Sequence, residues 1–203
     1  MAIAGVFAAG AAYAGCLWFI ATLVARRRAL PLGDVPGWVV VVCGCAAVGA
    51  DSFFAPGIAL TAGASLIGAI VCALVDARTG FIFDALSLTT AAVTCGFALL
   101  DSRLAESALA AAVVGGALAA IYLLTGRRGI GLGDVKLGSA MALGCGPQAA
   151  IVAIGSAFVL GALYAGVLVG LGRAKRSDAL RFGPFIAGGA AVGLTSSALG
   201  WLW

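Results

Sequence analysis

The chain has 203 residues, of which 63% are hydrophobic and only 10% are charged, with a formal net charge of +4. Apolar runs near the ~20 residues needed to span a bilayer recur along it. Little polar sequence remains to cover a water-soluble domain, which excludes a soluble globular protein. The sequence therefore predicts an all-α, polytopic integral membrane helix bundle. We expect residues 1–203 to form a single membrane domain, with N-terminal spans in 1–56 and the other spans in 57–203.

Eight apolar runs are predicted as transmembrane helices, at residues 2–25, 37–50, 57–75, 85–100, 107–125, 135–146, 148–172 and 183–203. The first run has no charge before it and is followed by three arginines at 26–28. A cleavable signal peptide has its positive charge first, so this run is predicted to be a membrane helix with its N-terminus outside.

The sixth run has only 12 residues and precedes Pro147, so as a helix it would be ~18 Å long. Fusing it with the seventh run would give one overlong span. The positive charges favour two spans instead. With eight spans and both termini outside, every lysine and arginine except Arg103 falls in a cytoplasmic loop. This agrees with the excess of positive charge in the cytoplasmic loops of membrane proteins. The last run ends with Trp201 and Trp203, which suit the opposite membrane interface.

This topology places four aspartates on the cytoplasmic side. Asp34 and Asp84 each precede or open an apolar run, so we interpret them as helix-start caps. Asp76 ends a run instead, where a carboxylate opposes the helix dipole and capping does not explain it. Ionisable groups of this kind near one membrane face are candidates for function. The carboxylates on the outer side are assigned no role.

Asp134 follows three alternate glycines, Gly129, Gly131 and Gly133, and precedes Lys136. The glycines are expected to resist helix formation and to let another chain lie close to the backbone. One interpretation is that Asp134 only caps the helix that follows. The other is that Asp134 is catalytic and that Gly131, Gly133 and Lys136 contact a peptide substrate, with lipid head groups as another partner for Lys136.

Metal chemistry is not expected. The chain has no histidine, and its six cysteines lie singly within apolar runs apart from Cys43 and Cys45. This lacks the ligand spacing of a zinc site, and two hard carboxylates alone make a poor site for other ions. We therefore expect no metal and no cofactor.

Three segments resemble the aspartic prepilin peptidases, membrane enzymes with an archaeal preflagellin branch. Residues 76–84 resemble the family's Asp followed after a short interval by Pro-Asp or Pro-Asn. Residues 131–136 match its Gly-x-Gly-Asp followed closely by Lys, and residues 181–185 resemble the Pro-Phe-Gly-Pro-Phe that opens its last span. Phe83 and Arg181 stand where the family has proline. The loop at 26–36 also lacks the cysteine-pair segment of the larger members.

The resemblance implies that Asp76 and Asp134 activate water to cut the basic leader peptide of type IV prepilin or pseudopilin precursors, at the cytoplasmic face of the cell's inner membrane. It indicates the short form of the family, without N-methylation. The expected partners are the precursor and the lipid bilayer, not nucleic acid, and the sequence indicates no oligomeric state. The helix dipoles predict Asp134 as the resting base and Asp76 as the resting acid.

Three alternatives remain open. A protease of the presenilin or signal-peptide-peptidase type also uses Gly-x-Gly-Asp, but Asp76 follows Val75 rather than tyrosine, and no Pro-Ala-Leu occurs. A small proton-coupled transporter would use the acids as relays. A non-enzymatic membrane component of a secretion system would use every aspartate as a cap.

Overall fold

The computed structural model describes residues 3–30, 32–33, 36–53, 56–127, 129–175 and 178–200, and these contain helices but no strand. The helices are α1 (Ile3–Arg27), α2 (Gly37–Phe53), α3 (Pro56–Thr79), α4 (Asp84–Leu100), α5 (Leu104–Leu124), α6 (Leu132–Cys145), α7 (Pro147–Gly170) and α8 (Gly183–Ala198). The predicted all-α class is confirmed, and each predicted run corresponds to one helix. The predictions for Asp34, Trp201 and Trp203 fall outside the described residues.

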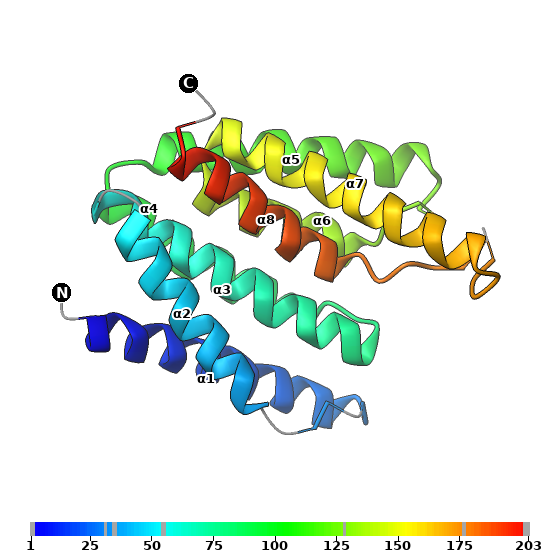
Figure 1. The fold of residues 1–203 in the computed structure, drawn as a ribbon, viewed down its shortest axis with the longest axis horizontal. Helices are drawn as coiled ribbons and strands as arrows, with labels where there is room; N and C mark the ends of the chain where they lie inside the picture. Colours follow the sequence, from blue (N-terminus) through cyan, green and yellow to red (C-terminus); the bar gives the residue numbers. More distant parts are fainter. Residues whose placement is uncertain are drawn as a thin grey trace.

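Successive helices run in alternate directions through the bundle (Figure 1). The turns after α1, α3, α5 and α7 gather at one end. We call it the basic end, because every described lysine and arginine except Arg103 lies at or near it. The start of α1, the end of α8 and the other turns gather at the opposite end, the terminal end. This arrangement agrees with the topology predicted from the charges, and the membrane side of each end remains a prediction.

The helix at the centre of the bundle is α3. In its most apolar stretch 72% of the residues are buried inside the protein, against 28% in α1, 22% in α5 and 17% in α7. All four of these helices are long and apolar enough to cross a membrane. Helices that are apolar on all sides but exposed face lipid. The protein is thus a helical membrane bundle around α3, and the number of spans stays a prediction.

A tight turn at Gly146 separates α6 from α7. Gly146 has φ 73° and ψ 163°, a conformation almost restricted to glycine, and Pro147 occupies the first turn of α7. The prediction of two separate helices here is confirmed. With 14 residues in α6 and 24 in α7, their lengths are ~21 Å and ~36 Å. Because both meet at this turn, α7 projects past the start of α6 at the basic end (Figure 1).

Small residues let α7 and α8 pack with their backbones in close contact. A Cβ on Gly189 would lie 2.1 Å from the carbonyl oxygen of Ala153, and one on Gly193 would lie 2.3 Å from that of Ala149. Ala149, Ala153 and Ala157 are buried at four-residue spacing along α7. This is the small-residue packing of membrane helices, and it fixes where α8 begins relative to α7.

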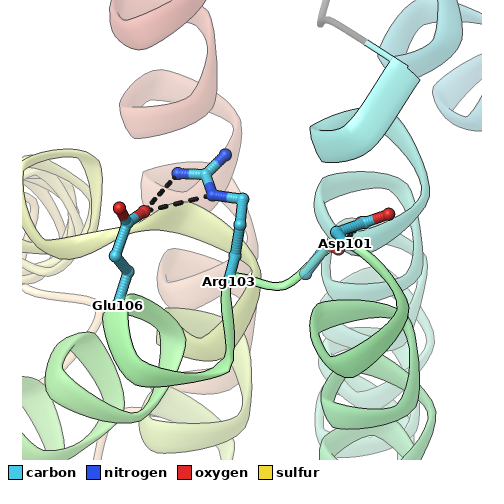
Figure 2. Close-up of polar contacts among 4 residues, drawn as sticks. Asp101, Arg103 and Glu106 are labelled. Carbon is cyan, nitrogen blue, oxygen red and sulfur yellow. Dashed lines mark hydrogen bonds and ion pairs between the residues drawn. The ribbon is translucent and has the colours of Figure 1, made fainter.

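Polar contacts at the terminal end hold the turn between α4 and α5. Figure 2 shows Arg103, whose Nε and Nη2 donate to Oε2 of Glu106 at 3.1 and 2.7 Å. Asp101 accepts a hydrogen bond from Oγ1 of Thr61 on α3 at 2.8 Å. The hydrogen bond of Asp101 fastens the turn to α3, and the ion pair joins two residues at the start of α5.

Candidate active site

Asp76 lies in the last turn of α3, because the helix continues to Thr79 instead of ending with the apolar run at Val75. Its side chain is buried, and its Oδ2 accepts a hydrogen bond from the backbone N–H of Gly183 at 3.1 Å. A Cβ on Gly183 would lie 2.9 Å from this same oxygen. The first residue of α8 therefore rests directly against Asp76, and only glycine fits there.

Asp134 is the third residue of α6 and is half-buried. Its Oδ2 accepts a hydrogen bond from the N–H of Gly131, the residue just before the helix, at 3.2 Å. A carboxylate near a helix N-terminus satisfies an otherwise free donor. Asp134 therefore stabilises the start of its own helix, but through one oxygen only.

Of the two glycines nearest Asp134, only Gly133 departs from the expectation that this stretch resists helix formation. Helix α6 begins at Leu132, so Gly133 is helical, and Gly131 is extended with φ −79° and ψ 147°. Gly133 has a packing role, because a Cβ there would lie 3.0 Å from Cβ of Ile82 in the loop after α3. This close approach sets the start of α6 against the end of α3.

The packing brings the two aspartates into one site. Helices α3 and α6 are in direct contact, and the carboxyl groups of Asp76 and Asp134 lie close enough to repel each other. Each uses Oδ2 to accept a backbone N–H. Among the described residues, no third side chain of a metal-binding type (histidine, cysteine, aspartate or glutamate) joins the two aspartates in a group that could hold a metal ion.

Arg181 lies beside this pair. Its Nη1 donates to the carbonyl oxygen of Ala77, next to Asp76 in α3, and its guanidinium acts electrostatically on Asp76. The segment before α8 is thereby joined to the end of α3. The resemblance leads one to expect proline at this position. A proline side chain has no donor and could not make the hydrogen bond that Arg181 makes to Ala77.

A cavity of about 740 Å³ adjoins Asp134. Its walls come from the loop between α5 and α6, one side of α7 and the segment before α8. The lining residues are Arg127, Gly129, Ile130, Gly131, Asp134, Phe158, Gly161, Ala162, Ala165, Asp178, Ala179, Leu180 and Phe182. Of the two aspartates only Asp134 lines the cavity, and Phe182 in its wall directly precedes Gly183, the partner of Asp76.

Lys136 and Asp84 form an ion pair, with Nζ 2.8 Å from Oδ1. Asp84 is the first residue of α4, and Phe83 occupies the N-cap position before it, so the interpretation of Asp84 as the helix-start cap is wrong. The pair connects α6 to α4. Contact of Lys136 with substrate stays a prediction, as does substrate contact at Gly131 and Gly133.

Sequence reasoning did not identify Gly183 as a partner of Asp76. The signal was the Gly-Pro pair that opens the last apolar run, since proline in the first turn marks a helix start with free N–H groups. Nothing in the sequence indicated which side chain those groups would meet.

Fold and site together define a helical membrane protein in which carboxyl groups from two helices lie within electrostatic reach of each other, one of them lining a cavity. Residues 64–166, just over half of the chain, match the Type IV leader peptidase family. The chain belongs to this peptidase family, and the matched region contains both aspartates.

A curated relative is the Prepilin leader peptidase/N-methyltransferase of Dickeya chrysanthemi. It is 32% identical over an alignment of 162 residues, and the match covers 73% of this chain and 57% of the relative. The chain therefore spans little more than half of that protein's length. No solved structure matches the chain significantly.

Proposed function

We propose that this protein is an aspartic endopeptidase that removes the basic leader peptide from type IV prepilin or pseudopilin-like precursors. One observation carries the proposal: Asp76 and Asp134, from the end of α3 and the start of α6, interact beside a cavity. Membership of the leader peptidase family supports the substrate class.

The chemistry needs a water molecule between the two carboxyl groups. Two neighbouring carboxylates cannot both ionise cheaply, so the pair shares one proton. The ionised carboxylate takes a proton from the water molecule as the water oxygen attacks the peptide carbonyl carbon. The protonated carboxyl group donates its proton to the carbonyl oxygen. The C–N bond then breaks, and the amine leaves with a proton. Coupled groups of this kind titrate as a pair.

The hydrogen bonds of the site favour particular oxygens for this work. A protonated carboxyl oxygen is a donor, and Oδ2 of both Asp76 and Asp134 accepts a backbone N–H. We therefore assign the shared proton and the bound water to the Oδ1 atoms of the two aspartates. The backbone donors orient the carboxyl groups while leaving one oxygen of each for catalysis.

Asparagine substitutions test the assignment. Asp76→Asn and Asp134→Asn should each reduce prepilin cleavage in detergent at least 10³-fold while the protein stays folded, because an amide replaces an acid or base at nearly the same size. Asp34→Asn and Asp84→Asn should keep substantial activity. Full cleavage by Asp134→Asn would refute the proposal.

We place the basic end at the cytoplasmic face of the inner membrane. The support is the gathering of cations at this end, which positively charged cytoplasmic loops explain. In a chain without its native cysteines, Thr125→Cys should be protected from a membrane-impermeant thiol reagent in intact cells and Ser102→Cys should react. The reverse labelling would invert the topology.

We propose peptidase activity alone. The relative from Dickeya chrysanthemi also bears the name N-methyltransferase. The loop at 26–36 lacks the cysteine pair that the larger family members carry. Mass spectrometry of a cleaved prepilin should find an unmethylated new N-terminus when S-adenosylmethionine is supplied.

A further inference from the structure

Buried hydroxyl groups gather where α1, α3 and α4 meet in the interior of the bundle. Thr90 and Thr94 are fully buried and lie one turn apart on the same side of α4. Tyr13 of α1 is half-buried, and its hydroxyl group lies near that of Thr90. Among the described residues four buried side-chain polar atoms have no well-formed hydrogen bond, and three of them are the hydroxyl oxygens of Tyr13, Thr90 and Thr94.

Threonines elsewhere in the bundle satisfy their hydroxyl groups within their own helix. Thr22, Thr89 and Thr195 each donate to the carbonyl oxygen four residues back, at 2.9, 2.7 and 2.7 Å, as threonine commonly does in a helix. Thr90 follows Thr89 directly and makes no such bond. A hydroxyl group without a partner in an apolar interior is unfavourable, so these hydroxyl groups need a partner from outside their own helices.

The backbone of α3 lies directly against the Thr90 side chain. A Cβ on Gly68 would lie 2.5 Å from Oγ1 of Thr90. Cys72, one turn further along the same side of α3, is buried and lies near the same hydroxyl group. A thiol is only a weak donor and a weak acceptor, so Cys72 satisfies Thr90 poorly. Asp76 is one more turn along this side of α3, so the buried hydroxyl groups lie behind the aspartate, toward the interior of the bundle.

Space for a small ligand exists beside these groups. A second cavity, of about 150 Å³, is lined by Tyr13 of α1 together with Ile67 of α3 and Val93 of α4, the chain neighbours of Gly68 and Thr94. A buried water molecule needs room comparable to the ~30 Å³ that it has in the liquid, and it typically makes ~3 hydrogen bonds. An apolar cavity stays dry, whereas converging polar groups hold water. The three hydroxyl groups supply this convergence.

We propose that the interface of α1, α3 and α4 is a water-binding site, in which buried water bridges the hydroxyl groups of Tyr13, Thr90 and Thr94. The water donates and accepts the hydrogen bonds that these side chains do not make with one another, and it joins α1 to α4 across α3. The site couples α1, which lies outside the matched residues 64–166, to the helix that carries Asp76. This inference does not depend on the proposed peptidase function.

Removing one hydroxyl group at a time tests the site. Thr90→Val and Tyr13→Phe each delete a hydroxyl group at nearly constant shape, and each should lower the melting temperature in detergent by ~2–4 °C, because the bridging water loses a partner. The double variant should lose clearly less than the sum of the two single losses, since both changes break the same bridge. Thr89→Val is the matched control. It removes a hydroxyl group that bonds to its own helix, so its effect should add to that of Tyr13→Phe.

A crystal structure that resolves ordered water gives the direct measurement. It should show water at ~2.5–3.0 Å from Oγ1 of Thr90, in contact also with the hydroxyl group of Tyr13. A higher melting temperature in Thr90→Val or Tyr13→Phe would mean that the hydroxyl groups are dry and unpaired, and it would overturn the site. Additive losses in the double variant would also overturn it, because Thr90 would then bond to its own helix as Thr89 does. Ordered water elsewhere in the bundle but none at Thr90 would overturn it as well.

Discussion

Replacing Gly183 with alanine should disable the site without removing any catalytic group. The N–H of Gly183 donates to Oδ2 of Asp76 at 3.1 Å. A Cβ at this position would lie 2.9 Å from that oxygen, 3.0 Å from Cβ and 3.2 Å from Cγ of Asp76. Non-bonded carbon atoms prefer ~3.5–4.0 Å, so either Asp76 or the start of α8 must move by roughly half an ångström or more.

The expected cost has two parts. A displacement of ~1 Å at a reacting group can reduce the rate ~10²-fold, so we expect Gly183→Ala to lower kcat between ten- and a hundredfold. Overpacking at a well-packed position costs ~1–3 kcal/mol of stability. Asp76 is buried, which leaves it little room to avoid the new methyl group.

Gly188→Ala is the matched control in the same helix. Its Cβ would lie 3.5 Å from Cδ1 of Leu160, an ordinary contact, and alanine is favoured over glycine within a helix by ~1 kcal/mol. Prepilin cleavage and thermal unfolding in detergent are measured for both variants. Cleavage by Gly183→Ala within twofold of native, in a folded protein, would refute the role we give to this contact.

Two further changes test the start of α6. Gly133→Val should lower cleavage at least tenfold, because the close contact with the loop after α3 leaves no space for a side chain, whereas Gly155→Val, with nothing within 4 Å of its Cβ, should not. Gly138 lies in the same helix as Gly133 but is unsuitable as a control position, because a Cβ there would lie 2.5 Å from a buried leucine. If Lys136 contacts substrate, Lys136→Gln should raise KM several-fold and Asp84→Asn should not. If both variants lose the same stability, less than ~1 kcal/mol, and cleave normally, the only role of Lys136 is its exposed ion pair with Asp84.

The sequence predicted the helices and their order well, because long apolar runs and the turn residues at Gly146 and Pro147 are strong local signals. It also predicted Asp76 and Asp134 at one end of the bundle, since the distribution of cations indicates which turns gather together. The burial of α3 could not be predicted, because the runs are similarly apolar and rich in small residues. No periodic stripe distinguishes the helix at the centre from those that face lipid.

The contact between Gly183 and Asp76 was not predictable for a related reason. It depends on the depth at which α7 and α8 pack, which the close approach of Gly189 and Gly193 to α7 determines. The ion pair of Lys136 with Asp84 likewise joins residues far apart in the chain. Contacts of this kind follow from helix register, and register leaves no local pattern in a sequence.

The alternating direction of the helices explains how one end can hold two carboxyl groups. The end of α3 must lie among the starts of even-numbered helices, so the C-terminus that carries Asp76 meets the N-terminus of α8. A helix C-terminus is unfavourable for a carboxylate, and a helix N-terminus is favourable. The N–H of Gly183 and the guanidinium of Arg181 thus counteract the unfavourable helix dipole of α3 at the Asp76 carboxylate. Asp134 lies at the favourable end of its own helix. The glycine that opens α8 therefore belongs to the candidate site as much as the two acids do.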